Sequence, residues 1–454
     1  MRPRSAWLGL AVVVLLMVSA MVVPAALDWN VHVFSFPPIH AEWQPRVGPG
    51  TPTALALGVV GMLYAVQAAE RWPWRRLLLA SYLMAVAWLA SLALVDGSAG
   101  IGDILGTEYE YLRTAHQTTD VSAMLHEYVS RIPLSSPSNW PVHIAGHSPG
   151  ALLFFVALVR LGLGGGLAAG WVVLLVAATT PVAVLVALRR LGAELMARRA
   201  APFLVLGPAA LWMAVSADAM FGAVAAWGLC CLAIAATEQS RVRLTGWSIA
   251  AGLLLGYCVM LSYGLPLLAV LAVGVLVVAR TWRPLPWAAG AALAVVLAFA
   301  AAGFSWWDAY PVLRQRYWDG VASRRPMRYW VWGDLAALCF SAGPLLGPSV
   351  ASAGSRARAA LRRARSLAPG GRTGSSTVDG SDRPIVWLCL CASACILVAD
   401  LSGMSKAEVE RIWLPFVPWL LLGCSLLPAR WRRLGLAGQV VFALVLQHLF
   451  FTGW

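Results

Sequence analysis

Residues 149–163 read PGALLFFVALVRLGL, and whether this segment crosses a membrane decides the placement of every loop that follows it. The segment is apolar for only about a dozen residues before Gly164-Gly165-Gly166, and it contains Arg160. A spanning helix needs about 20 consecutive apolar residues, whereas a shorter apolar run suits an interfacial or re-entrant helix. We therefore predict that residues 149–163 do not span.

The distribution of basic residues supports this choice. If residues 149–163 do not span, 23 basic residues fall on one side of the membrane and 10 on the other, leaving Arg160 aside. If they do span, 18 of those 23 change sides. Because short cytoplasmic loops are enriched in arginine and lysine, the arginine-rich side is predicted to be cytoplasmic. The long loops 96–148 and 304–333 are then predicted to face outward.

The composition of the whole chain indicates a membrane protein. Of its 454 residues, 60% are hydrophobic and 12% are charged, whereas a soluble domain carries about 25% charged residues. Apolar runs of helical length recur along the chain, so we predict an all-α polytopic membrane protein with about thirteen transmembrane helices. The predicted spans are 7–26, 51–69, 77–95, 167–188, 201–217, 219–237, 245–261, 264–280, 285–303, 333–350, 385–401, 413–427 and 435–450. A soluble enzyme, a collagen and a disordered chain are excluded.

The net charge of +14 does not indicate a nucleic-acid partner. All but one of the 34 basic residues are arginine, and most lie in short loops between apolar runs, which is a topology signal. Four regions follow from the runs and loops. We predict a two-span N-terminal addition (1–76), a main transmembrane module (77–350), a basic cytoplasmic linker (351–384) and a C-terminal three-helix unit (385–454).

Acidic residues concentrate on the predicted outer side, although the topology rests on the basic residues alone. Fifteen of the 20 acids fall there, and the seven histidines lie outside or, for His448, near the outer end of the last span. Intramembrane and membrane-edge ionisable residues are costly and usually functional. The sequence therefore predicts that polar chemistry is concentrated at the outer face.

The loop 96–148 carries the candidate catalytic residues. Asp103, Glu108 and Glu110 lie just beyond a predicted span, and a predicted amphipathic helix (119–131) separates them from His143 and His147. Partial desolvation at the membrane edge raises the pKa of a carboxyl group, so that it can act as a general base on a hydroxyl group. Any of the three carboxylates could be that base.

At this point the chain resembles the GT-C superfamily of multi-span glycosyltransferases, which take a sugar from a polyprenyl-phosphate donor. Protein mannosyltransferases and lipid A aminoarabinose transferases belong to it. The run Thr107-Glu108-Tyr109-Glu110-Tyr111 resembles the family's Asp-Glu-x-x-Tyr pattern, with Thr107 in place of Asp. His147-Ser148-Pro149-Gly150 resembles its His-Pro-Pro element, with Ser148 in the first Pro position. These departures leave open which carboxylate is the base.

The resemblance continues to about residue 427 and implies further site residues. Asp218 lies in Ser216-Ala-Asp218-Ala, which is similar to an Asp-Ala-Leu element at the outer end of a later span. Lys406 and Arg411 lie in a segment that resembles the one that brings cations to the donor phosphate. The module 77–350 would then be GT-C-like and catalytic. A rival alignment places Asp28 and Phe36-Pro37-Pro38 in these roles, but that loop lacks the tandem acids.

The chemistry of the outer cations can also be stated without the family. A phosphate leaving group gains negative charge, which a fixed cation stabilises. Lys406 and Arg411 could serve, or they could simply pair with Glu408 and Glu410 and anchor a helix. Arg324 and Arg325 lie among five outer arginines of loop 304–333, a placement against the positive-inside tendency that predicts an anionic partner.

The sequence thus predicts an inverting glycosyltransferase with catalytic Glu108, Glu110 or Asp103. Predicted substrate-binding residues are His143, His147, Asp218, Arg324, Arg325, Lys406 and Arg411. The predicted partners are a polyprenyl-phosphate-linked sugar, a glycan, glycolipid or protein acceptor, and membrane lipid. No cofactor is predicted; a metal held by His143, His147 and nearby acids is the weaker alternative. A transporter, a lipid flippase or an envelope-assembly scaffold are the alternative functions. Arginine in place of lysine and abundant alanine, glycine and leucine suggest a GC-rich bacterium and its cytoplasmic (inner) membrane, with the active site facing outward.

Overall fold

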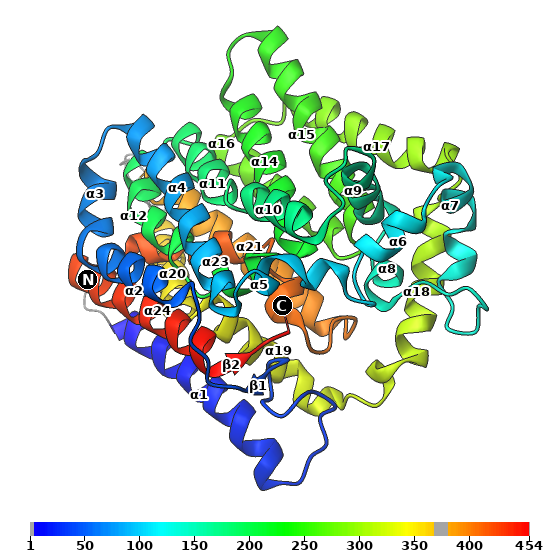
Figure 1. The fold of residues 1–454 in the computed structure, drawn as a ribbon. Helices are drawn as coiled ribbons and strands as arrows, with labels where there is room; N and C mark the ends of the chain where they lie inside the picture. Colours follow the sequence, from blue (N-terminus) through cyan, green and yellow to red (C-terminus); the bar gives the residue numbers. More distant parts are fainter. Residues whose placement is uncertain (1–3, 367–379, 454) are drawn as a thin grey trace.

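Helices make up most of the chain in this computed structural model, which describes residues 4–366 and 380–453 (Figure 1). The longer helices are α1 (Arg4–Ala26), α4 (Trp74–Ala93), α14 (Ala217–Thr237), α15 (Arg241–Leu261), α17 (Leu285–Ala301), α18 (Trp306–Asp319), α19 (Met327–Ala342), α20 (Leu346–Ser366), α21 (Arg383–Leu401) and α24 (Ala429–Leu449). The shorter ones are α2 (Thr51–Val60), α3 (Val66–Arg71), α5 (Ala99–Gly102), α6 (Leu112–Gln117), α7 (Val121–Glu127), α8 (Val142–Gly146), α9 (Pro149–Arg160), α10 (Gly166–Ala177), α11 (Thr180–Arg190), α12 (Glu194–Val205), α13 (Ala210–Met213), α16 (Leu268–Ala279), α22 (Val409–Ile412) and α23 (Val417–Leu420). The predicted all-α class is confirmed.

Short 3-10 and π-helical turns, labelled η, connect some of these helices. They are η1 (Gly61–Ala65), η2 (Leu94–Asp96), η3 (Ile104–Gly106), η4 (Val129–Arg131), η5 (Leu265–Leu267), η6 (Val321–Ser323) and η7 (Leu421–Leu426). The strands β1 (Glu42–Trp43) and β2 (Phe450–Phe451) form one antiparallel pair, in which Glu42 lies opposite Phe451. This pair joins the first outer loop to the end of α24.

The protein is a multi-pass membrane protein. Among the described residues, seven helical segments are long and apolar enough to cross a membrane, and two bent helix pairs bring the number to nine at most. The seven are Arg4–Ala26, Thr51–Arg71, Trp74–Asp96, Gly166–Arg190, Ala217–Thr237, Arg241–Leu261 and Arg383–Leu401. These numbers do not reach the thirteen spans that the sequence predicts.

Proline and glycine interrupt several of the runs that the sequence predicts as single spans. The run 201–217 is divided where Gly207-Pro208 separates α12 from α13. The run 333–350 is divided at Gly343-Pro344, where α19 and α20 are bent by 102°. Gly343 has a φ of +82°, and proline lacks the N–H that an uninterrupted helix requires. Hydropathy alone does not register these breaks, so it overestimates the number of straight spans.

Part of the predicted linker 351–384 is helical. Residues 351–366 continue α20 as a regular helix, because alanine and arginine favour helix. Residues 367–379 lie outside the described residues, and α21 begins at Arg383.

The predicted N-terminal addition, residues 1–76, packs directly on the rest of the bundle where it is described. Helix α1 lies against α19 and α20. Gly9 of α1 and Gly347 of α20 meet backbone to backbone, so that a Cβ atom at either position would collide with the other chain segment. Small residues permit this close approach of membrane helices.

The ion pairs separate into two groups that match the two predicted sides of the membrane. In the first group, loops predicted to be cytoplasmic contact one another, through Arg199–Glu70, Arg432–Glu70, Arg190–Glu238, Arg243–Glu238 and Arg356–Asp382. In the second, loops predicted to be outer contact one another, through Arg46–Asp96, His143–Glu110 and Arg411–Asp218. The fold therefore brings together the loops that the charge pattern assigns to one side.

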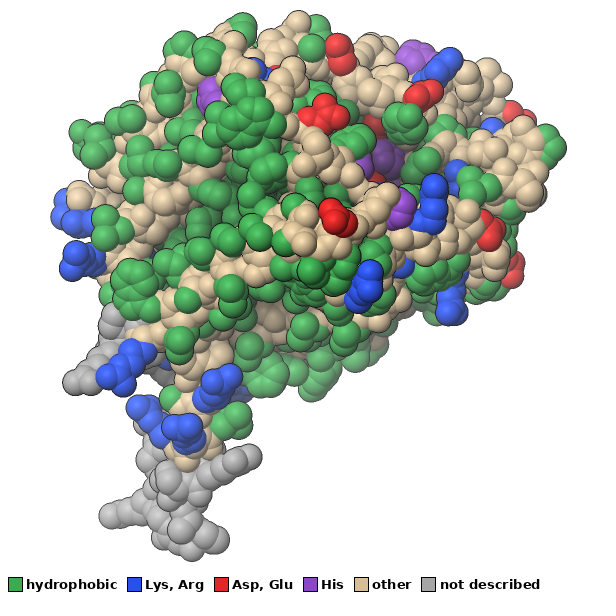
Figure 2. Space-filling model, turned by 90° about the horizontal axis from the view of Figure 1, so that it is seen from below, with side chains coloured by type: hydrophobic (Ala, Val, Ile, Leu, Met, Phe, Trp, Pro, Cys, Tyr) green, Lys and Arg blue, Asp and Glu red, His purple; other side chains and the backbone are tan. Residues whose placement is uncertain are grey.

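Much of the surface is apolar. Figure 2 shows hydrophobic side chains spread broadly over one face, with charged side chains in smaller groups. On α1, Leu8 and Leu15 are 67% and 66% exposed. Contiguous apolar surface of this kind is expected where lipid, rather than water, surrounds the helices.

Candidate functional site

A buried ion pair joins loops that the charge pattern predicts to be outer. Arg411 of α22 places its Nη1 2.5 Å from Oδ2 of Asp218, in the first turn of α14. Each side chain is 2% exposed. The N-terminus of α14 also favours a carboxylate, because the helix dipole is positive there. Ser216 fixes this end by accepting a hydrogen bond from the N–H of Ala219.

His143 extends the ion pair to Glu110. Nη2 of Arg411 lies 3.2 Å from Nε2 of His143, and Nδ1 of the same ring lies 2.7 Å from Oε1 of Glu110. A guanidinium can only donate and an ionised carboxylate can only accept. The consistent tautomer of His143 therefore carries its proton on Nδ1, donates it to Glu110 and accepts from Arg411 on Nε2.

His147 and Tyr111 close the arrangement into a ring. Nε2 of His147 lies 3.8 Å from Oδ1 of Asp218, and its Nδ1 lies 2.5 Å from the hydroxyl of Tyr111, the neighbour of Glu110 in the sequence. We call these six residues the buried polar ring: Glu110, Tyr111, His143, His147, Asp218 and Arg411. Three outer segments and the start of α14 meet in it.

Burial dominates the titration of His147. Removal from water lowers the pKa of its imidazole to about 4; the positive charge of Arg411 adds to this effect, and Asp218 opposes it. The pKa of the Tyr111 hydroxyl is raised well above its usual value, first by burial and then by Glu110 and Asp218. Both groups are therefore neutral at pH 7 and act as hydrogen-bonding groups rather than as charges.

The local fold holds the histidines in place. His143 lies in α8, and His147 follows that helix directly. The buried hydroxyl of Tyr128 lies 2.8 Å from the carbonyl oxygen of Ile144 and 3.1 Å from that of His147, donating to this turn. The indole of Trp140 donates in turn to the carbonyl of Tyr128 at 2.9 Å.

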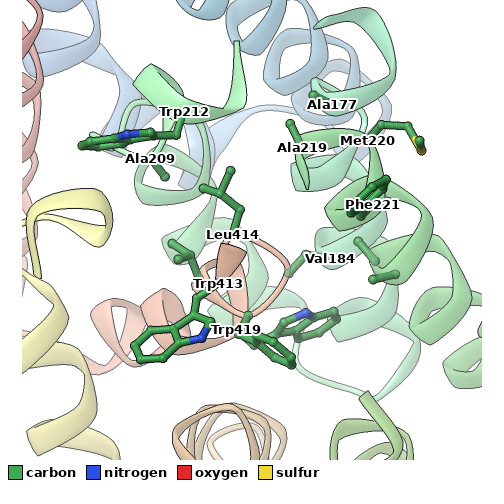
Figure 3. Packing of buried hydrophobic residues seen from close by; sticks show 14 of the residues in the cluster. Ala177, Val184, Ala209, Trp212, Ala219, Met220, Phe221, Trp413, Leu414 and Trp419 are labelled. Carbon is green, nitrogen blue, oxygen red and sulfur yellow. The ribbon is translucent and has the colours of Figure 1, made fainter. Parts of the chain in front are cut away.

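A packed apolar core lies directly behind the ring. Trp413 and Leu414 follow Arg411 in the sequence, and Phe221 follows Asp218; none of the three is more than 2% exposed. Figure 3 shows them together with Val184, Ala219, Met220 and Trp419. Because close-packed side chains resist displacement, this core fixes the relative positions of α14 and α22.

Glu408 lies at the partly exposed edge of the ring. Its side chain is 24% exposed, and its Oε2 lies 3.3 Å from Nη2 of Arg411 and 3.9 Å from Nε2 of His143. Its Oε1 lies 3.9 Å from Nη2 of Arg325. Burial would raise the pKa of Glu408, but the positive charge of Arg411, with smaller contributions from His143, His40 and Arg325, lowers it to about 2. Glu408 is therefore an anion held among cationic and imidazole groups.

Glu410 does not pair with Arg411, although it is the next residue. Its side chain is fully buried, and its Oε1 accepts a hydrogen bond from the backbone N–H of His40 at 3.0 Å. Burial raises the pKa of this carboxyl group to about 7. From the sequence, only an anchoring role was predicted for Glu410. Glu408 and Glu410 are two residues apart, and residues at this spacing lie on different sides of a helix, so the sequence did contain a sign that the two acids have different surroundings.

Lys406 joins two loops instead of pointing at the ring. Its Nζ donates to the carbonyls of Ala322 and Arg325 at 2.6 and 2.8 Å. Nη1 of Arg325 donates in return to the carbonyl of Lys406 at 2.6 Å. The ammonium group is thus bonded to backbone oxygens of loop 304–333, and of the two basic residues it is Arg325 whose charge faces Glu408.

Besides Lys406 and Arg325, three of the predicted site residues lie outside the ring. Asp103, Glu108 and Arg324 are exposed on outer loops, whereas Glu110 is 2% exposed within the ring. Glu108 and Glu110 lie in the turn that follows η3, where Glu108 faces the solvent and Glu110 faces the interior. Glu110 is thus the predicted carboxylate that the fold joins to His143, His147, Asp218 and Arg411.

Metal binding was the alternative use of the two histidines. Within residues 4–366 and 380–453, no group of three or more histidine, cysteine or acidic side chains has a geometry that could hold a metal ion. Here the guanidinium of Arg411 is the cation that Asp218 and Glu408 face. No family model, curated protein or solved structure matches the chain.

Proposed function

We propose that this protein is an inverting glycosyltransferase that transfers a sugar from a polyprenyl-phosphate donor to an acceptor of the cell envelope at the outer face of the membrane. The observation that carries the proposal is the buried polar ring, in which Glu110, His143, Arg411 and Asp218 are linked by successive contacts at the outer loops. The ring combines a desolvated carboxylate with a fixed cation, and sugar transfer from a phosphate needs both.

In the proposed reaction Glu110 is the general base. Its Oε1 is bonded to His143, and its Oε2 is buried without a hydrogen-bond partner among the described residues. The acceptor oxygen attacks the anomeric carbon, its proton passes to Glu110, and the bond between that carbon and the phosphate oxygen breaks. The electron pair of the broken bond stays on the phosphate. Attack from the side opposite the leaving group inverts the anomeric centre.

The donor phosphate has a proposed place at the edge of the ring. Glu408, itself an anion, lies between Arg411 and Arg325 and next to His143. A phosphate group has the same sign of charge and a similar hydrogen-bonding pattern. Ala407 and Glu408 both have positive φ values, +69° and +61°, a conformation that non-glycine residues seldom adopt. We infer that Glu408 leaves this place when the donor binds.

The membrane arrangement belongs to the same proposal. We place α9, an apolar helix of 12 residues, along the outer leaflet as a re-entrant or juxtamembrane element. Ser148 and Gly150 at its start are bonded to α15, through the carbonyl of Val259 and the hydroxyl of Tyr257. The donor would enter laterally beside it from the lipid, in the cytoplasmic (inner) membrane of a bacterium with the ring facing outward.

Transfer of radiolabelled sugar from a polyprenyl-phosphate donor to membrane acceptors tests the proposal. The protein with Glu110→Gln should lose transfer while its melting temperature in detergent stays near that of the unaltered protein. Glu108→Gln is the matched control, because it removes an exposed carboxylate two residues away. Full transfer by the Glu110→Gln protein would contradict the proposal. A transporter or flippase would instead move substrate without forming a product.

A further inference from the structure

A second charged site lies among the loops that are predicted to be cytoplasmic, in a cavity of about 380 Å³. Three arginines from three helices line it: Arg199 of α12, Arg356 of α20 and Arg432 of α24. Ser5 of α1 and Ser352 of α20 add hydroxyl groups to the lining. No residue of the buried polar ring takes part.

The three guanidinium groups are only partly neutralised. Arg199 and Arg432 share one carboxylate, that of Glu70, at 3.2 and 2.8 Å. Arg356 pairs with Asp382. Three positive charges therefore meet two negative ones around the cavity. The neighbouring Arg433 adds further positive field at Arg432.

One donor of Arg432 has no hydrogen-bond partner in the described part of the chain. Its side chain is 6% exposed; Nη1 donates to the carbonyl of Leu427 at 2.6 Å and Nη2 to Glu70. Its Nε is buried and has no hydrogen-bond partner among the residues that the structure describes. A buried N–H on a charged group is unfavourable without an acceptor, so a ligand oxygen that reached this atom would stabilise it.

The start of α24 adds to the positive potential. Pro428 and Ala429 line the cavity where this 21-residue helix begins, and no side chain caps that end. The first N–H groups of a helix lack partners within it, and the dipole is positive there. Ala6, Leu426 and Leu427 supply an apolar part of the wall.

We propose that this cavity binds a phosphate-bearing anion. Guanidinium groups match phosphate oxygens in charge and in geometry, and a helix start accommodates the same oxygens. The apolar wall suits carbon atoms attached to the phosphate. Two sources share this chemistry: the headgroup of an anionic membrane lipid and free phosphate. The site does not depend on the proposed sugar transfer.

The test uses the full chain purified in detergent. The protein is titrated with dioleoylphosphatidylglycerol, with dioleoylphosphatidylcholine and with inorganic phosphate, and bound ligand is counted by native mass spectrometry. We expect the anionic lipid to bind more tightly than the zwitterionic one. Arg432→Gln and, separately, Arg199→Gln should weaken binding about tenfold, because each removes a charged donor. Arg241→Gln removes the same charge from an exposed position that does not line the cavity, and this protein should bind like the unaltered one.

Each outcome decides the matter. Binding of inorganic phosphate alone, with the same dependence on Arg432 and Arg199, supports the site and identifies free phosphate as its source. Equal binding of the two lipids, or binding that Arg432→Gln and Arg199→Gln leave unchanged, would overturn the proposal. Arg199 is partly exposed, so its replacement remains informative if the protein with Arg432→Gln does not fold.

Discussion

Asp218 and Arg411 lie 193 positions apart in the sequence, and their side chains meet at 2.5 Å with 2% of each exposed. Without Asp218, the buried guanidinium of Arg411 would keep only the partly exposed Glu408 as a close counter-ion. Asp218→Asn should therefore lower the free energy of unfolding by about 3–5 kcal/mol, measured as a loss of thermal stability in detergent. Asp308→Asn replaces an exposed outer acid and should change stability little. Equal stability of the two variants would contradict a structural role for the ion pair.

The carboxylate of Glu110 is expected to dominate catalysis. Removing a general base typically slows a reaction by about 10²–10⁴-fold, so Glu110→Gln should reduce sugar transfer to that extent. Asp103→Asn and Glu108→Gln should leave the rate within about twofold, because both side chains are exposed and lie away from the ring. Measured rates in which Glu108→Gln is the slow variant would assign the base to Glu108 instead.

Glu408 should compete with the donor phosphate. Glu408→Gln removes a negative charge from between Arg411 and Arg325, so donor binding should tighten by roughly fivefold. Equilibrium binding of a radiolabelled polyprenyl phosphate to the purified protein measures this. Glu127→Gln, on an exposed part of the outer loop, is the control. Weaker binding after Glu408→Gln would mean that Glu408 belongs to the donor site as a ligand.

The raised pKa of Glu410 predicts that the stability of the protein depends on pH. Burial raises its pKa from 4.5 to about 7, so between these values the folded state keeps a proton that the unfolded state has released. The contribution of Glu410 to stability is therefore complete below about pH 4.5 and is lost as the pH rises through about 7. Glu410→Gln cannot ionise and can still accept from His40. Its melting temperature should match that of the unaltered protein near about pH 5 and exceed it near about pH 8; parallel curves would contradict the assignment.

The bonds of Lys406 should hold loop 304–333 in place. Lys406→Met keeps the length of the side chain but removes its donors to Ala322 and Arg325, each worth about 1.5–3 kcal/mol for a charged group. Hydrogen exchange of the amides around residues 320–326 should accelerate. Arg324→Gln, on an exposed side chain of the same loop, should leave exchange unchanged. Unchanged amide exchange in the Lys406→Met protein would mean that contacts other than those of Lys406 stabilise this loop.

The fold class followed from hydropathy, but the number of straight helices did not. The mean hydropathy of a window measures how favourably its residues transfer into lipid, and it contains no information on backbone geometry. Gly343-Pro344 ends α19 within one apolar run, and Gly207-Pro208 does the same after α12. Both Gly-Pro pairs can be read from the sequence. Treating them as helix breaks would have reduced the predicted number of spans.

The sequence predicted most residues of the candidate site but few of the contacts between them. Charge counting assigned Glu110, His143, Asp218 and Arg411 to one side of the membrane, and these are the residues that meet. The pairing of Asp218 with Arg411, however, depends on how α14 packs against α22, which no local pattern encodes. The position of Lys406 was likewise not predictable, because its acceptors are backbone carbonyls that any residue could supply.

The two-residue pairing of β1 with β2 has a practical consequence for work on this protein. His40, whose N–H supports Glu410, lies two residues before β1, and the partner strand begins directly after α24. A purification tag or reporter fused directly after Leu449 would replace Phe450 and Phe451 and remove the partner of β1. Weak activity of such a fusion would first indicate that this pairing is lost.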